Sequence, residues 1–172
     1  MRGTSLSKMI IDEAKIQNAL FRYLIQKGKE YIIPNIYNGG SEADILTSTK
    51  AGYLQEYEIK ISLSDFKADF QKRKHLWMKD SAPHGQYPID RFWYVAPIYA
   101  IPLCIPDHAG LIEVSVGRMG YVLLRTIKPA PKLNGKKYGK GFRDKVIKSM
   151  MYKYWNMAGN LNQLKCEREV LR

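Results

Sequence analysis

The sequence has few cysteines, few acidic residues and no long apolar run, and each shortage excludes a class of protein. Cys104 and Cys166 lie too far apart for a zinc-ligand pair or a disulfide framework, so we expect free thiols in a reducing compartment. The longest uncharged run, residues 92–106, is too short to span a bilayer and is interrupted by Pro97 and Pro102. These shortages predict a cytoplasmic protein with no membrane anchor.

The shortage of acidic side chains is confined to the C-terminal third of the chain. In the whole chain, 28 lysines and arginines stand against 16 aspartates and glutamates, which gives a formal net charge of +12. Residues 1–117 hold 14 basic and 13 acidic side chains, whereas residues 118–172 hold 14 basic and only 3 acidic ones. An excess this one-sided is typical of a surface that binds a polyanion, and DNA is the expected partner.

The length and the hydrophobic pattern predict one α/β domain. A chain of 172 residues with 45% hydrophobic side chains suits a single domain over residues 1–172, with a core at about 9–126 and a basic C-terminal loop and helix at about 127–160. Periodicity and turn residues predict a helix at 9–27, strands at 30–37, 43–48 and 53–61, a helix at 64–79, a strand at 89–96, a strand pair at 110–116 and 119–126, and a helix at 142–158. This order predicts a mixed central sheet flanked by helices, in which Pro34 restricts the first strand to an edge.

The strand at 53–61 carries the main chemical signal. Its alternation places Glu58 and Lys60 on one face, roughly 6.5–7 Å apart along the backbone. Asp44 lies on the preceding strand, and the intervening turn brings it towards this pair. Two carboxylates can hold Mg²⁺ or Mn²⁺, and a lysine can stabilise the transition state of phosphodiester hydrolysis or orient the attacking water. An exposed ion pair on a strand would explain the same spacing equally well.

Glu13 is a candidate for a further site residue. It falls on the apolar stripe of the first expected helix, where an ionised carboxylate is costly unless it is paired or binds a cation. We therefore expect Glu13 to complete a metal site with Asp44 and Glu58. A solvated position in the first helical turn is the alternative for Glu13, and Glu56 is a rival metal ligand because it shares a strand face with Glu58.

Two groups of polar and basic residues are expected to contact the nucleic acid. The first follows helical spacing on the helix at 64–79 and comprises Lys67, Gln71 and Lys74, with His75 beside them. The second lies in the basic C-terminal loop and helix and comprises Lys136, Lys137, Lys140, Arg143 and Lys148. A solvated helix face is the alternative for the first group. We expect His108 to be an ordinary loop residue, and we expect core packing for Met150, Met151, Trp155 and Met157.

The order of these residues resembles a known nuclease superfamily. Glu13, then Asp44, then Glu58-Ile59-Lys60 resembles the PD-(D/E)XK nucleases. Over roughly residues 10–160, the chain is similar to the MmcB-like DNA repair proteins, on the segments EADILTSTKAGYLQEYEIKISLSDFKADFQK, IDRFWYVAP and IPDHAGLIEVSVGRMGYVLLRT. The resemblance implies a restriction endonuclease-like fold and phosphodiester hydrolysis that depends on a divalent metal. Glu42 stands where that family is expected to have arginine, which argues against a phosphate contact at this position.

The expected function is therefore that of a metal-dependent DNA nuclease in DNA repair, recombination or phage DNA processing. Asp44, Glu58 and Glu13 are expected to bind Mg²⁺ or Mn²⁺, and Lys60 to assist the reaction. The expected substrate is duplex, single-stranded, branched or damaged DNA, with RNA as an alternative that the sequence leaves open, and a homodimer is consistent with such an enzyme. Two alternatives use the same fold: a nucleic-acid-binding module without catalysis, and a resolvase of branched DNA junctions.

Overall fold

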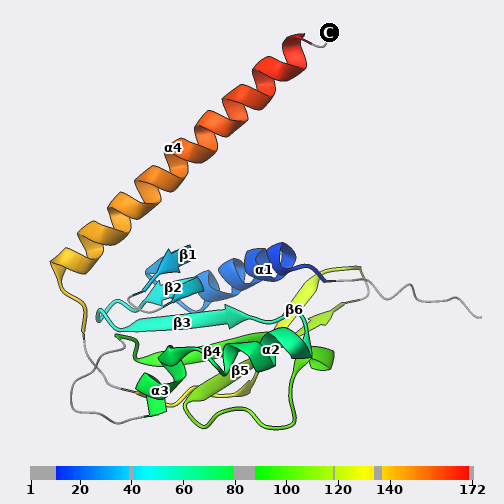
Figure 1. The fold of residues 1–172 in the computed structure, drawn as a ribbon, viewed down its shortest axis with the longest axis vertical. Helices are drawn as coiled ribbons and strands as arrows, with labels where there is room; N and C mark the ends of the chain where they lie inside the picture. Colours follow the sequence, from blue (N-terminus) through cyan, green and yellow to red (C-terminus); the bar gives the residue numbers. More distant parts are fainter. Residues whose placement is uncertain (1–10, 39–40, 80–87, 118, 134–136, 171–172) are drawn as a thin grey trace, which may run out of the picture. The chain divides into compact units, whose positions relative to one another are not determined.

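The computed structural model describes residues 11–38, 41–79, 88–117, 119–133 and 137–170, and its fold is mixed α/β (Figure 1). The chain divides into two compact units, residues 1–137 and 138–172. The first unit contains α1 (Glu13–Gln26), β1 (Tyr31–Tyr37), β2 (Glu42–Ser48), β3 (Leu54–Ile59), α2 (Leu63–Asp69), α3 (Arg73–Lys79), β4 (Arg91–Pro97), the 3₁₀ turn η1 (Ile98–Ala100), β5 (Ala109–Val116) and β6 (Val122–Lys128). The second unit contains α4 (Lys140–Val170), a helix of 31 residues.

Six strands form one mixed sheet in the order β1-β2-β3-β4-β5-β6. β4 runs parallel to both of its neighbours, β3 and β5, whereas the other three neighbouring pairs are antiparallel. β1 is an edge strand, as Pro34 predicts, because proline has no N–H to donate to a second neighbour. In the register of β2 and β3, Leu46 lies opposite Glu56 and Ile45 opposite Tyr57. The two residues of each pair therefore point to the same face of the sheet.

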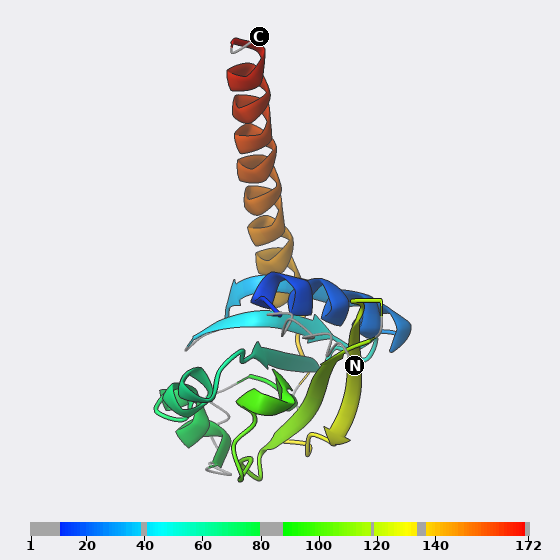
Figure 2. The same cartoon turned by 90° about the vertical axis from the view of Figure 1, so that its right-hand side faces the viewer.

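One face of the sheet is covered by the amphipathic helix α1 (Figure 2). Its residues Ile16, Leu20 and Leu24 recur at helical spacing and are completely buried. They pack against strand side chains that point to the same face, namely Ile45, Tyr57, Ile59, Val95, Ile112 and Val114. Each fully buried aliphatic side chain contributes about 1.5–3 kcal/mol to folding, so this layer is the main apolar core. Asp12 caps the helix by accepting a hydrogen bond from the Lys15 N–H at 2.8 Å.

The opposite face of the sheet meets α2 and α3 and is aromatic and charged. The ring of Tyr94 lies 4.2 Å from that of Phe66 and 4.9 Å from that of Phe92, between centroids. Glu58 and Lys74 are buried on this side as well. Charged groups here are therefore shielded from water by aromatic rings, which strengthens the interactions between them.

The helix expected at 64–79 is instead two short helices. α2 begins after Ser62, whose hydroxyl accepts a hydrogen bond from the Asp65 N–H at 3.2 Å. Residues 70–72 form a tight turn in which each N–H donates to the carbonyl three residues before it, and α3 starts at Arg73. Side chains after this turn therefore do not continue the face on which Lys67 lies.

The strands agree with the expected ones to within three residues, whereas the C-terminal helix is longer than expected. The first five strands begin and end within two residues of their expected bounds, and β6 lies at Val122–Lys128 rather than 119–126. α4 is longer than expected and continues to Val170, because helix-forming residues such as Leu, Gln, Lys and Glu continue beyond the apolar pattern. Within the described part of the chain, every helix is too short or too polar to cross a membrane.

Candidate active site

Asp44 is tied to the chain segment between Glu58 and Lys60. Its Oδ2 accepts a hydrogen bond from the Ile59 N–H at 2.6 Å. The backbone carbonyl of Asp44 also accepts a hydrogen bond, from Nε2 of Gln17 on α1 at 3.0 Å. The contact follows from the antiparallel register of β2 and β3, which brings the start of one strand to the end of the other. The three residues expected from the sequence are therefore brought together.

Asp44 lies in negatively charged surroundings. Its pKa is raised to about 7, first by burial and then by the negative charges of Glu58 and Glu13. The Ile59 N–H and Lys60 oppose this rise without cancelling it. A carboxylate in such surroundings is stabilised by binding either a proton or a cation, because both reduce the repulsion.

Lys60 is a buried ammonium surrounded by carboxylates. Only 4% of the residue is exposed. Its Nζ lies 3.1 Å from Glu58 Oε2, 3.4 Å from Asp69 Oδ1 and 3.7 Å from Asp65 Oδ1. Burial favours the neutral amine, but the three carboxylates outweigh burial and hold the pKa of Lys60 above its ordinary value. Lys60 therefore provides a fixed positive charge at neutral pH rather than a proton acceptor.

Lys74 belongs to this cluster, and its expected position on an exposed stripe is wrong. The side chain is completely buried, and its ammonium lies 2.9 Å from Glu56 Oε1 and also donates to Glu58 Oε1. Glu58 therefore meets Lys60 at one carboxylate oxygen and Lys74 at the other. The turn before α3 is the physical reason, because it directs Lys74 towards the sheet. Glu56, the rival metal ligand, is paired with Lys74 instead.

His75 was expected on the same exposed stripe and is also buried. Its Nε2 lies 2.8 Å from Asp69 Oδ2, and its Nδ1 lies 3.0 Å from His108 Nε2. The Tyr94 hydroxyl donates to the same oxygen of Asp69 at 2.8 Å. His108 is not an ordinary loop residue, since burial, followed by the effect of His75, lowers its pKa to about 4. These four residues form a hydrogen-bonded chain that reaches Lys60 through Asp69.

The sequence pattern missed this chain because its members come from α2, α3, β4 and the loop before β5. One of them had a usable signal. Asp69 falls beside Phe66 and Phe70 on a helical wheel, and a carboxylate next to an apolar stripe indicates a buried, partnered charge. His75, Tyr94 and His108 had no comparable signal, because their meeting depends on tertiary structure.

Glu13 is exposed, and its expected place in the buried stripe is wrong. α1 begins at Glu13 directly after its cap Asp12, so the buried stripe starts only at Ile16. An acidic residue in the first turn is favoured by the helix dipole and does not need a cation. The charge of Glu13 still contributes to the raised pKa of Asp44, which places it near the cluster.

Asp44 and Glu58 fit a hard divalent cation in ligand type and in charge. Their mutual repulsion raises the pKa of Asp44, and a cation between carboxylates would remove that repulsion. Mg²⁺ commonly takes only one or two carboxylates from a protein and keeps several waters. In the ranges that the structure describes, no three His, Cys, Asp or Glu side chains converge closely enough to hold a metal ion. Among the described residues, the candidate ligands are therefore the pair Asp44 and Glu58.

The residues expected to contact nucleic acid are mostly exposed. Exposed members of the two groups are Lys67, Gln71, Lys137, Lys140, Arg143 and Lys148. Lys136 lies outside the described residues. The core packing expected for Met150, Met151, Trp155 and Met157 is wrong, because these side chains on α4 are 37–67% exposed. Basic and aromatic side chains therefore occur together on the surface of α4.

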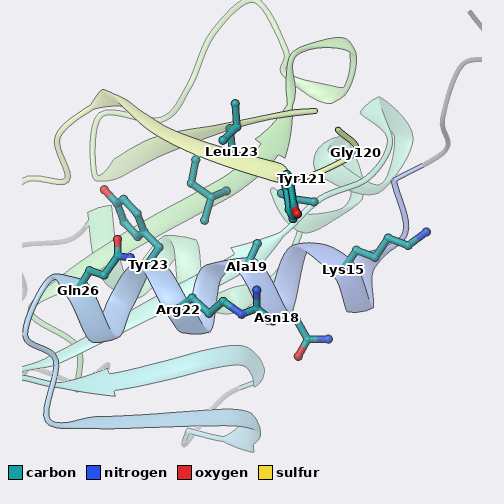
Figure 3. Close-up of a pocket in the computed structure, with 11 residues that line it drawn as sticks. Lys15, Asn18, Ala19, Arg22, Tyr23, Gln26, Gly120, Tyr121 and Leu123 are labelled. Carbon is teal, nitrogen blue, oxygen red and sulfur yellow. The ribbon is translucent and has the colours of Figure 1, made fainter. Parts of the chain in front are cut away.

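A cavity of about 520 Å³ lies between α1 and β6 (Figure 3). Its lining includes Lys15, Asn18, Arg22 and Gln26 from α1, with Tyr121 and Leu123 from the other side. The residues of the charged cluster do not line it. The cavity therefore belongs to the side of the sheet that α1 covers and is separate from the candidate active site.

Comparison with known proteins supports the fold. No family model matches the sequence, and no curated protein matches it. The structure is similar to that of a protein of unknown function from Silicibacter pomeroyi, with a TM-score of 0.57 and 19% sequence identity. The similarity covers 86% of this chain and 88% of the other. The mixed α/β fold, with a six-stranded sheet flanked by helices, is therefore shared with a solved structure.

Proposed function

We propose that the protein is a metal-dependent DNA nuclease of the PD-(D/E)XK kind, with a restriction endonuclease-like form of the mixed α/β fold and a relationship to the MmcB-like proteins. The hydrogen bond from the Ile59 N–H to Asp44 carries the proposal, because Ile59 stands between Glu58 and Lys60. This contact of 2.6 Å places the Asp44 carboxylate beside the backbone between Glu58 and Lys60. Two carboxylates and a lysine are the set that phosphodiester hydrolysis with a metal requires.

The three residues divide the chemistry between them. Asp44 and Glu58 would hold Mg²⁺ or Mn²⁺, which when bound supplies a Lewis acid for the phosphate and a more acidic water. Lys60 keeps its positive charge and stabilises the negative charge that develops on the phosphate in the transition state. Its burial strengthens this effect, because the interaction is little screened by water.

DNA is the proposed substrate because of the distribution of charge. The net charge of +12 favours a polyanion. Exposed Lys67 and Gln71 follow Lys60 closely in the chain, and α4 adds exposed Lys140 and Arg143. Such side chains bind the phosphate backbone without regard to base sequence. The proposed substrates therefore include duplex, single-stranded and branched DNA.

Lys74 favours a second candidate function, which is nucleic-acid binding without catalysis. Both carboxylate oxygens of Glu58 are met by ammonium groups, one from Lys60 and one from Lys74. If Lys74 never releases Glu58, a metal ion lacks its second ligand. The remaining activity would then be binding that weakens with salt and does not depend on metal.

A cleavage assay separates the two functions. Labelled duplex, single-stranded and branched DNAs are incubated with Mg²⁺, Mn²⁺ or EDTA and with wild type, Asp44→Asn or Lys60→Ala. Exposed Glu42 on the same strand as Asp44 supplies the matched control, Glu42→Gln. We expect metal-dependent cleavage by wild type and control, and a loss of at least about 100-fold in both site variants with binding retained. Binding without cleavage in every metal would support the second candidate instead.

A further inference from the structure

We propose that Asp69 positions Lys60 for the reaction, and that His75 and Tyr94 hold Asp69 in place. This inference rests on the proposed nuclease function, in which Lys60 supplies the positive charge. The inference rests on the geometry of the Asp69 carboxylate. One oxygen faces lysines, and the other faces His75 and Tyr94.

Asp69 is a fixed, buried anion. Its Oδ1 lies 2.6 Å from Lys72 Nζ and 3.4 Å from Lys60 Nζ. Its Oδ2 meets His75 Nε2 and the Tyr94 hydroxyl, each at 2.8 Å. Burial raises the pKa of Asp69, but the hydrogen bond with His75 and the nearby lysines outweigh it and hold the pKa well below its usual range. Oδ2 is therefore held by two hydrogen bonds, whereas Oδ1 accepts no hydrogen bond from the described residues and meets the lysines as an ion pair.

Lys60 needs a partner of this kind. Its backbone is fixed directly after β3, where the Lys60 N–H donates to the Val95 carbonyl at 3.0 Å. The side chain beyond it is a flexible four-carbon stem, so its ammonium is placed by contacts at the end. Glu58 makes one such contact, but Glu58 is also a proposed metal ligand. Of the other two carboxylates near Lys60, Asp69 is the closer, at 3.4 Å against 3.7 Å for Asp65, and it is completely buried whereas Asp65 is 45% exposed.

His75 is itself held from both sides, which supports a positioning role. His108 has a lowered pKa and is neutral at pH 7, so its Nε2–H can donate to His75 Nδ1 at 3.0 Å. This arrangement leaves the Nε2–H of His75 to donate to Asp69. The imidazole orientation is therefore determined, and with it the orientation of the Asp69 carboxylate.

A network that serves stability alone is the competing explanation. Buried charges are expensive, and apolar residues of similar size are often at least as stabilising. The surroundings of Asp69 already include aromatic rings such as Phe66, Phe70 and Tyr94, which could pack without any charge. A purely stabilising network would change the melting temperature and leave the turnover of folded enzyme unchanged. A positioning network lowers kcat.

The test is steady-state cleavage kinetics of the full chain with Mn²⁺, using the DNA that wild type cleaves. Asp69→Asn is expected to lower kcat by about 10- to 100-fold, with KM and Mn²⁺ affinity unchanged. Tyr94→Phe removes one hydrogen bond and keeps the ring, and should lower kcat by about 3- to 10-fold. Glu42→Gln is the matched control, because exposed Glu42 lies on the same strand as Asp44, and its kcat should stay within about twofold of wild type.

The outcomes separate this inference from the function on which it rests. If wild type cleaves and both Asp69→Asn and Tyr94→Phe keep full kcat, the inference is overturned and the nuclease function stands. An equal loss in Glu42→Gln overturns it as well. If Asp69→Asn fails to fold, the kcat of Tyr94→Phe decides. If wild type cleaves no DNA with any metal, the proposed function fails, and this inference fails with it.

Discussion

The ammonium of Lys74 lies 2.9 Å from the Glu56 carboxylate, and both side chains are completely buried. The same ammonium donates to Glu58, so α3 supplies one positive charge to two acids on one face of β3. Burial lowers the pKa of Lys74, but these acids, together with Asp69, outweigh it and raise the pKa above its ordinary value. The fold therefore places a positive charge beside both Glu56 and Glu58.

Lys74→Met is expected to destabilise the protein by about 3–5 kcal/mol, because it leaves buried carboxylates without their shared cation. Urea unfolding at pH 7 measures the loss. Lys72→Met is the matched control, since Lys72 also pairs with a buried acid but its side chain is 41% exposed, and its loss should be clearly smaller.

A second substitution tests whether charge is the cause. Glu56→Gln in the Lys74→Met background removes one of the two acids and should recover part of the lost stability. A double variant no more stable than Lys74→Met would mean that packing, rather than charge, explains the effect.

Asp44→Asn is expected to stabilise the metal-free protein at pH 8 while removing metal-dependent cleavage. The pKa of Asp44 is raised to about 7 in the folded protein, against 3.8 when unfolded. The folded state therefore binds the proton more tightly, and the stability from this group is complete below about pH 3.8 and lost as the pH rises through 7. Asparagine avoids this loss, with a gain on the order of 1–2 kcal/mol because the site is partly solvated.

Thermal unfolding in EDTA at pH 8 and pH 5 measures this difference. The advantage of Asp44→Asn should shrink on acidification, whereas exposed Glu42→Gln should match wild type at both pH values. Added Mg²⁺ should stabilise wild type and not Asp44→Asn. A variant less stable than wild type at pH 8 would contradict the raised pKa.

The position of Asp44 relative to Glu58 and Lys60 followed from local rules. Strand alternation has a period of two, so it assigns Glu58 and Lys60 to one face without any tertiary information. A short turn between β2 and β3 makes an antiparallel pair, and this pairing brings Asp44 to the end of β3. The edge position of β1 followed in the same way from Pro34.

The predictions for Lys74 and His75 were wrong because one tight turn interrupts the helical period. Spacing of three or four residues places Lys67, Gln71 and Lys74 on one face only if the helix is continuous. After the turn at 70–72, Lys74 points to the sheet while Lys67 and Gln71 stay exposed. The contact between His75 and His108 depends on how two distant segments pack, which no local period encodes.

His108→Gln is expected to reduce the loss of stability on acidification. The pKa of His108 is lowered to about 4 in the folded protein, against 6.5 when unfolded. The unfolded state therefore binds the proton more readily, so the stability from this group is complete above about pH 6.5 and is lost as the pH falls through 4. Urea unfolding between pH 7 and pH 4 should show wild type losing up to about 3 kcal/mol more than the variant. Equal pH dependence in both proteins would contradict the prediction.

The exposed basic residues of α4 are expected to carry much of the DNA affinity. Replacing Lys140, Arg143 and Lys148 together by Gln should weaken binding at every DNA sequence and lower the slope of log K against log salt by about one per lost phosphate contact. Glutamine keeps helix propensity, so α4 should persist. Fluorescence anisotropy in EDTA at several salt concentrations measures both quantities.

A control of equal charge decides whether α4 or net charge is responsible. It replaces by Gln three basic residues that are exposed elsewhere, namely Arg22, Lys27 and Lys50. Both triple variants reduce the net charge of +12 by the same amount, so a general electrostatic effect would weaken binding equally in both. Direct phosphate contacts by α4 would lower the salt slope only in the α4 variant, because counterion release depends on the phosphates that are contacted. Equal slopes in the two variants would remove α4 from the binding surface.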